Sequence, residues 1–304
     1  MLQKLAAAML NPRHAARQVY GSTYLWPHNY AVLRHPKAKG PVPQHEPRAH
    51  AQVVSRLRKE AYDVREYRID VDDFRRYLAK AEYSRFPRYC RGGRSRNFVE
   101  KSLEHYLAAK LLDINRDETY IDVANDSSPA PEIYAALYGC NSYRQDLKFP
   151  AGLHGSRIGG SAAAMPVPDR FAAKMALHCS FEHFEQDADV CFIREAGRVL
   201  AHGGRVCILP LYIYTDYAIQ TDLAVLPRGA LNFDPAAVVY CARGWGNRHG
   251  RVYDVPHLSS RIRAALGNLT LTVYVIENEK EVHPSCYVKF VGLFEKVETS
   301  SGVA

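Results

Sequence analysis

The stretch that most restricts how this chain can fold is residues 165–211, in which two apolar runs flank a helical pattern. Ala172–Leu177 has the length and composition of a buried strand, and the polar sequence His178–His183 follows it directly. A helical pattern over Asp187–Leu200 then leads through a glycine pair to a second buried run, Arg205–Leu211. Two strands joined by a helix in this way lie parallel in one sheet. The stretch therefore predicts an α/β protein in which helices cover a parallel sheet.

The same alternation begins near residue 119, where Gly, Pro and Asp separate short apolar runs. Three more strands and a short helix are predicted before residue 165, at Tyr120–Val123, Pro131–Leu137 (the helix), Ser142–Gln145 and Arg157–Gly160. Near the end of the chain, Leu269–Glu277 and Cys286–Lys296 alternate apolar and polar residues on either side of a polar turn. Such a pair is typical of an antiparallel hairpin. We therefore expect a mostly parallel sheet that ends in antiparallel strands.

The first 118 residues show a different pattern. Every charged side chain before Glu46 is Lys or Arg, which favours a basic helical segment that packs on the domain or frays from it. Residues 46–118 are predicted to be helical, with helices at His50–Val64, Val71–Tyr83 and Asn97–Leu112. The predicted organisation is a basic N-terminal segment and linker (1–45), a helical cap (46–118) and an α/β domain (119–298).

The composition argues against several classes of protein. No apolar run approaches the roughly 20 residues that a membrane-spanning helix needs, and the longest, Val206–Ile213, is interrupted by Pro210. The seven cysteines are scattered without paired spacing. This favours reduced thiols in a cytoplasmic protein over a secreted scaffold held by disulfides.

Polar residues follow the predicted strands at their carboxyl ends, which is where parallel sheets bind ligands. After the first strand, the loop from Asp122 to Pro129 is rich in Asn, Asp and Ser, which form tight turns through their own side chains. Asp146 follows the second predicted strand, where nucleotide-binding α/β folds place an acid that accepts hydrogen bonds from ribose hydroxyls. A turn or a helix cap is the structural alternative for Asp146.

The order of these segments resembles the second half of a class I S-adenosylmethionine-dependent methyltransferase domain, of the methyltransferase type 11-like kind. The matching pieces are, in chain order, Met165-Pro166, Pro168-Asp169, the strand Ala172–Leu177, Glu182-His183, Arg198-Val199-Leu200 and Gly203-Gly204. The resemblance covers roughly residues 119–296. It implies a Rossmann-like, mostly parallel seven-stranded sheet with an antiparallel final strand, preceded in this chain by the N-terminal helical cap.

The resemblance also implies S-adenosyl-L-methionine as the cofactor. The family has the pattern Asp-x-Gly-x-Gly-x-Gly after its first strand, whereas this chain keeps the Asp and has Ala124, Asp126 and Ser128 at the glycine positions. The family often has Asp-Ala, with the Asp at the adenine amino group, where this chain has Ser161-Ala162. The cofactor-binding residues implied by the resemblance are Asp122, Ala124, Asn125, Asp126, Asp146, Ser161, Ala162 and Met165.

The candidate catalytic residues are His178, Glu182 and His183. Methyl transfer needs a deprotonated nucleophile held in line with the methyl group, and a nearby imidazole can accept the nucleophile's proton. A carboxylate beside an imidazole orients the ring and raises its pKa. A Glu-His pair that only caps the following helix is the structural alternative. His154, Cys179 and the two candidate histidines, His178 and His183, match no common zinc-ligand spacing. No metal site is therefore expected.

Two further groups of polar residues have both a structural and a functional interpretation. On the helix predicted over 97–112, Glu100, Lys101 and Glu104 are either ordinary surface neighbours or part of a cap over the cofactor. The loop Asn247–Asp254 either contacts a ligand or forms a solvated edge.

These features predict a methyltransferase that acts on an O or N nucleophile of a small-molecule or saccharide-like acceptor. The replaced glycines motivate a first alternative, a catalytically inactive methyltransferase-like scaffold in a glycan-modification pathway. The loop Arg85–Arg96, in which arginines are interleaved with aromatic residues, motivates a second, a nucleic-acid-binding protein. No recognised nucleic-acid module surrounds this loop, so a local anion site or a solvated surface is the favoured interpretation.

Overall fold

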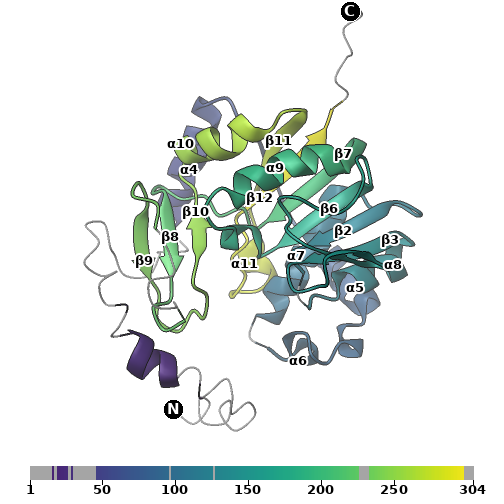
Figure 1. The fold of residues 1–304 in the computed structure, drawn as a ribbon, viewed down its shortest axis with the longest axis horizontal. Coiled ribbons are helices and arrows are strands. Elements are labelled where there is room, and N and C mark those ends of the chain that lie inside the picture. Colours follow the sequence, from purple (N-terminus) through teal and green to yellow (C-terminus); the bar gives the residue numbers. More distant parts are fainter. Residues whose placement is uncertain are drawn as a thin grey trace, which may run out of the picture.

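The structure, a computed structural model, describes residues 16, 19–26, 29, 46–95, 97–125, 127–225 and 233–297. Within these residues the central element is a nine-stranded sheet with the order β1-β11-β12-β7-β6-β2-β3-β5-β4 (Figure 1). Its strands are β1 (Asp63–Tyr67), β2 (Thr119–Val123), β3 (Asn141–Asp146), β4 (Gly152–His154), β5 (Arg157–Gly159), β6 (Ala172–His178), β7 (Leu200–Leu209), β11 (Leu269–Ile276) and β12 (Phe290–Lys296).

Most neighbouring strands run parallel. β2 pairs in parallel with β3 and with β6, and the same direction continues from β6 to β7 and from β3 to β5. β12 is antiparallel to both of its neighbours, β7 and β11, and β4 is antiparallel to β5 at the far edge. The expected Rossmann-like, mostly parallel sheet with a reversed final strand is therefore confirmed. β1 and β4 extend it at the two edges.

Two layers of helices cover the sheet (Figure 1). One face carries α4 (Pro47–Lys59), α9 (Ala188–Val199) and the helical turns that begin at α10 (Val255–His257). The other face carries α5 (Val71–Ala81), α7 (Phe98–Leu112) and α8 (Ala130–Tyr138). Because both faces are covered, the central strands β2 and β6 are buried along most of their length.

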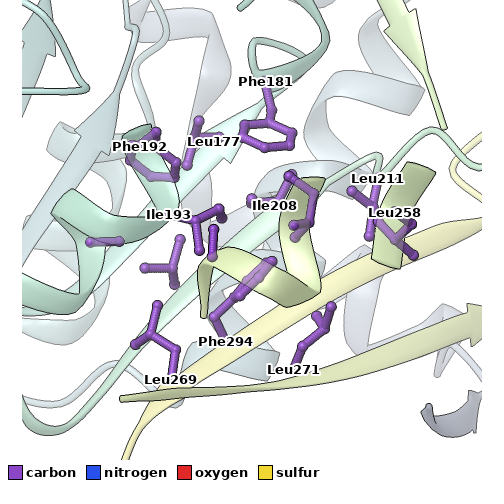
Figure 2. Packing of buried hydrophobic residues seen from close by; sticks show 14 of the residues in the cluster. Leu177, Phe181, Phe192, Ile193, Ile208, Leu211, Leu258, Leu269, Leu271 and Phe294 are labelled. Carbon is purple, nitrogen blue, oxygen red and sulfur yellow. The ribbon is translucent and has the colours of Figure 1, made fainter. Parts of the chain in front are cut away.

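Helix α9 shows how the sequence pattern builds one of these layers. Its buried apolar residues recur at helical spacing and include Phe192 and Ile193. In Figure 2 these two side chains face Leu177 of β6 and Ile208 of β7. The strand–helix–strand unit predicted over residues 165–211 is confirmed and forms the middle of the core.

The region before β2 differs from its prediction in one element. The first helix ends at Lys59 and does not continue to Val64, because Asp63–Tyr67 forms strand β1 and pairs with β11. This edge strand reads DVREY, and most of its side chains are exposed, so the sequence lacks an apolar strand signal. Residues 46–118 therefore add a strand to the sheet as well as helices. The predicted basic segment 1–45 falls largely outside the described residues.

The chain between β7 and β11 forms a small three-stranded sheet with the order β10-β8-β9. Its strands are β8 (Ala218–Thr221), β9 (Val238–Cys241) and β10 (Gly250–Val252). In Figure 1 this small sheet stands beside the main sheet. An isolated β-bridge pairs Tyr253, just after β10, with Ile213 in the chain that follows β7. In the part of the chain that the structure describes, no helix is long and apolar enough to cross a membrane.

Candidate active site

The order of the main sheet reverses at β2, because β3 lies on one side of it and β6 on the other. In open α/β sheets, ligands bind at such a switch point, beyond the carboxyl ends of the strands. A cavity of about 200 Å³ lies here, and its wall includes Asp122, Ala124, His178, Cys179 and, from α7, Lys101. We call it the β2–β6 cavity.

Asp122 and His178 form a buried pair in the wall of the β2–β6 cavity, with 3.0 Å between Oδ1 and Nδ1. The other carboxylate oxygen of Asp122 accepts a hydrogen bond from Asn125 Nδ2 at 2.5 Å. Because a carboxylate only accepts hydrogen bonds, His178 carries a proton on Nδ1. Its Nε2 is buried without a hydrogen-bond partner among the described residues. In the neutral ring, Nε2 is therefore the basic nitrogen, and it is not engaged by the protein.

The loop after β2 makes its turn without glycine. Ala124 has a φ of +54°, in the left-handed region that favours glycine. The side chain of Asn125 braces the turn, since its Oδ1 accepts from Ser128 N at 2.7 Å and its Nδ2 donates to Ser128 O at 3.1 Å. Asp126 lies outside the described residues. The turn thus depends on the Asn125 amide in place of glycine.

We expect Ala124→Gly to stabilise the protein by about 0.5–1 kcal/mol. Glycine relieves the left-handed strain of about 1–2 kcal/mol, and part of this gain is offset by the greater entropy of the unfolded chain. The same substitution at Ala135, on the exposed side of α8, should instead cost about 1 kcal/mol. Urea unfolding followed by circular dichroism measures both variants. An Ala124→Gly protein less stable than the parent would show that the turn is not strained.

The residues predicted to hold a nucleoside lie along the same edge of the sheet. Gln145 crosses this edge, because its Oε1 accepts from Ala124 N at 3.0 Å and its Nε2 donates to Gly160 O at 2.5 Å. Asp146 ends β3, and its Oδ1 accepts from Lys148 N at 2.9 Å. Through this hydrogen bond Asp146 stabilises a turn, which is the structural alternative given above for this residue.

Ser161, Ala162 and Met165 follow β5. Ser161 Oγ accepts from the backbone nitrogen of Ala163 at 3.2 Å, whereas Ala162 and Met165 are buried in the core. Together with Asp146, these residues are not among the described residues that line the β2–β6 cavity. The structure therefore brings three of the predicted cofactor residues to the cavity, namely Asp122, Ala124 and Asn125.

A second cavity, of about 360 Å³, lies between the carboxyl ends of β6 and β7 and the small sheet. Its wall combines aromatic side chains, including Tyr212 and Trp245, with polar ones, including Gln220 and Arg251. Concave sites of 300–1,000 Å³ with a few convergent polar groups are the usual form of small-molecule sites. We call this cavity the β7–β10 pocket.

Glu182 and His183 lie in the wall of the β7–β10 pocket, on the helical turn η4 (Phe181–His183). Two hydrogen bonds join this turn to the start of β10. His183 Nδ1 donates to His249 O at 2.6 Å, and His249 Nδ1 donates to Glu182 O at 3.1 Å. Burial lowers the pKa of His249 to about 3, so its ring is a neutral structural link. The two elements on either side of the pocket are thereby held together.

The buried polar atoms in the wall of the β7–β10 pocket that lack a hydrogen-bond partner among the described residues include Glu182 Oε2 and Arg251 Nε. The two residues are 7% and 3% exposed. Burial raises the pKa of Glu182, although His183 Nε2 lies 3.7 Å from its Oε1 and acts in the opposite direction. A buried donor or acceptor without a partner is costly, so this wall is suited to a ligand that supplies both kinds of partner.

Lys101 and Cys179 border both the β2–β6 cavity and the β7–β10 pocket. Glu104 holds them together, with its Oε1 at 3.2 Å from Lys101 Nζ and at 3.1 Å from Cys179 Sγ. Glu100 and Glu104 are fully buried, because Tyr287, whose backbone nitrogen donates to Glu100 Oε2 at 2.8 Å, and Cys179 at the end of β6 lie against this side of α7. Burial and the neighbouring Glu104 raise the pKa of Glu100 to about 8. The interpretation of these acids as ordinary surface neighbours is therefore wrong.

The three predicted catalytic residues divide between the two spaces. His178 lines the β2–β6 cavity, whereas Glu182 and His183 line the β7–β10 pocket. Gln220 and Trp245 also line this pocket and were not predicted from the sequence. They come from the small sheet and from the turn before β10. The only sequence signal for them is a tryptophan flanked by two glycines.

The loop Arg85–Arg96 also contributes to the site, apart from Arg96, which lies outside the described residues. Tyr89 lines the β2–β6 cavity and stacks on His105 with 5.6 Å between ring centroids. In this structure an aromatic side chain of the loop therefore packs inward. Among the described residues, no group of three or more His, Cys, Asp and Glu side chains could hold a metal ion.

Comparisons with known proteins add the following. No family model matches the chain, and no curated protein matches it. Among solved structures, it is similar to a Burkholderia thailandensis 1,6-didemethyltoxoflavin-N1-methyltransferase with bound S-adenosylhomocysteine, at 13% identity and a TM-score of 0.40 over 84% of this chain and 93% of that one. It is also similar to a SAM-dependent methyltransferase from Methanosarcina mazei, at 12% identity and a TM-score of 0.38 over 61% and 95%. Likeness at this level concerns the fold alone.

Proposed function

We propose that this protein is an S-adenosylmethionine-dependent methyltransferase. The cofactor would bind over the carboxyl ends of β2 and β6, and a small, saccharide-like acceptor would bind in the β7–β10 pocket. The observation that carries the proposal is that the two cavities adjoin at the switch point, where Lys101 and Cys179 border both of them. A group transfer between two bound molecules needs such an arrangement, because the reacting atoms must meet.

The residues of the β2–β6 cavity fit the amino-acid end of this cofactor. The turn at Ala124, in the wall of this cavity, has the left-handed backbone that glycine favours. Lys101 offers an ammonium group to a carboxylate, and Asp122 lies beside it in the wall. Because the cavity is smaller than the usual 300–1,000 Å³, the nucleoside would extend along the edge toward Asp146 and Ser161. When bound, the cofactor supplies a methyl group on a sulfonium.

The chain's own residues would position the acceptor and take its proton. His183 donates from Nδ1 to a carbonyl, so its Nε2 is the basic nitrogen and can accept a proton in the β7–β10 pocket. The hydrogen bond to His249 O orients the ring, and the Glu182 carboxyl, 3.7 Å from Nε2, favours the protonated ring electrostatically. His178 Nε2 is a second basic nitrogen, at the β2–β6 cavity. Asp122 keeps it in the required tautomer.

A hydroxylated ring is the acceptor that the β7–β10 pocket fits best. A hydroxyl group both donates and accepts, so neighbouring hydroxyls can satisfy Glu182 Oε2 and Arg251 Nε together. The amide of Gln220, a residue that is 5% exposed, likewise offers one acceptor and two donors. The faces of Trp245 and Tyr212 suit the C–H surface of a sugar ring.

Binding of S-adenosylhomocysteine measured by isothermal titration calorimetry tests the proposal. We expect saturable binding at submillimolar concentration. The double variant Lys101→Met/Glu104→Gln should weaken it at least tenfold, because it removes the ammonium group without leaving its carboxylate unpaired. Lys59→Met, at the exposed end of α4, is the matched control. Absence of binding at millimolar ligand would reject the enzymatic function and leave the methyltransferase-like scaffold.

A further inference from the structure

A third cavity lies farther along the same edge of the sheet. It has a volume of about 690 Å³, and its wall runs from one side of α4, between Pro47 and Arg58, to the carboxyl ends of β1 and β11. His50 and Lys289 border both this cavity and the β7–β10 pocket. We call it the α4 groove.

The three cavities lie in a row, because the strands beneath them point the same way. β1 and β11 are parallel to each other. Because β12 is antiparallel to both β11 and β7, β11 runs in the same direction as β7, β6 and β2. All of these strands except β12 therefore end at one edge. Three strand spacings separate the middle of β1 and β11 from the middle of β7 and β6, where the β7–β10 pocket lies, which is about 14 Å. That distance is several times the width of one sugar ring.

The chemistry of the α4 groove differs from that of the pocket. Arg58 pairs with Glu66 at 2.8 Å, and Lys289 lies 3.6 Å from Glu279. The charged side chains of the wall are thus balanced in sign, and the described residues that line the groove include no Phe, Trp or Tyr. Such a wall offers hydrogen-bond donors and acceptors beside the aliphatic surface of Ala51, Val54 and Val275, and it selects for no net charge. Sugar units present both hydroxyl groups and C–H faces to such a wall.

We propose that the acceptor is an oligosaccharide chain that occupies both spaces. The modified unit lies in the β7–β10 pocket, and the following units pass His50 and Lys289 into the α4 groove. This inference rests on the proposed function and specifies its substrate. A polar, uncharged chain is the occupant that satisfies a charge-balanced groove continuous with a pocket suited to hydroxyl groups.

A printed glycan array tests this, with series that run from mono- to tetrasaccharides and a peptide array beside it. We expect the tetrasaccharide of at least one series to bind at least tenfold more tightly than its monosaccharide. Ala51→Trp places a large ring in the α4 groove from an exposed position on α4. It should reduce tetrasaccharide binding to the monosaccharide level and leave monosaccharide binding unchanged.

Lys59→Trp is the control, because Lys59 is exposed on the same helix and does not line the groove. Equal affinity for all lengths, no effect of Ala51→Trp, selective capture of peptides, or no glycan bound would each overturn the oligosaccharide proposal. S-adenosylhomocysteine binding is measured on the same preparations. If it persists, the methyltransferase function stands and only the acceptor class is rejected, whereas its absence rejects the function itself.

Discussion

Replacing Asp189 by alanine should lower the free energy of unfolding by about 3–5 kcal/mol. Asp189 is fully buried on α9 and pairs with two arginines, at 2.6 Å from Arg251 Nη1 and 2.7 Å from Arg261 Nη2. Its Oδ2 also accepts from Tyr253 OH at 2.6 Å. Removal of the carboxylate leaves the buried guanidinium of Arg251 without its counter-charge, and that uncompensated charge is the source of the loss.

The matched control is Asp187→Ala, two residues earlier. Asp187 also pairs with Arg261, at 3.1 Å, but its side chain is 79% exposed. Because exposed ion pairs contribute about 0–1 kcal/mol, this variant should unfold close to the parent. Denaturant unfolding of both proteins makes the comparison. A loss of less than 1 kcal/mol for Asp189→Ala would mean that Asp189 does not hold Arg251 in the wall of the β7–β10 pocket.

Glu100→Gln should make the protein more stable at alkaline pH, by on the order of 4 kcal/mol near pH 8. Burial and Glu104 raise the folded-state pKa of Glu100 from 4.5 to about 8. The folded protein therefore holds a proton that the unfolded chain releases above about pH 4.5. The stability from this group is complete below that pH and is lost as pH rises through about 8. Glutamine resembles the protonated acid, and its carbonyl can still accept from Tyr287 N.

The test is a series of unfolding curves between pH 5 and pH 9. The parent should lose stability relative to Glu100→Gln as pH rises, and the difference should be smallest, below about 1 kcal/mol, near pH 5. Glu277→Gln, an exposed acid beyond β11, should run parallel to the parent at every pH. Identical pH dependence of Glu100→Gln and the parent would show that Glu100 is ionised in the folded protein.

Most of the main sheet could be predicted, since its central strands are buried on both faces and appear as apolar runs. β6 and β7, with α9 between them, are the clearest case. β1 could not be predicted, because an edge strand exposes charged residues and is joined to the sheet by pairing with a distant strand, β11. The small sheet was missed for a related reason. Its strands have three or four residues each, too few to show a period.

The site was predictable only where strand ends determine it. Asp122 and His178 meet because parallel neighbouring strands end at the same edge. Glu182 and His183 follow within five residues, yet the turn η4 carries them to the wall of the other space. The burial of Glu104 depends on its contact with Cys179, which is distant in the sequence, and local sequence does not show which helix faces are covered.

The left-handed backbone at Ala124 affects how relatives of this protein can be detected. Because the Asn125 amide braces it, the bend forms in this chain without glycine, so the backbone path at this position does not require a particular residue. A comparison of residue identities therefore fails to detect such a similarity at a smaller divergence than a comparison of backbone torsion angles does. Distant relatives of this protein should therefore be sought by comparing backbone dihedral angles at the end of β2.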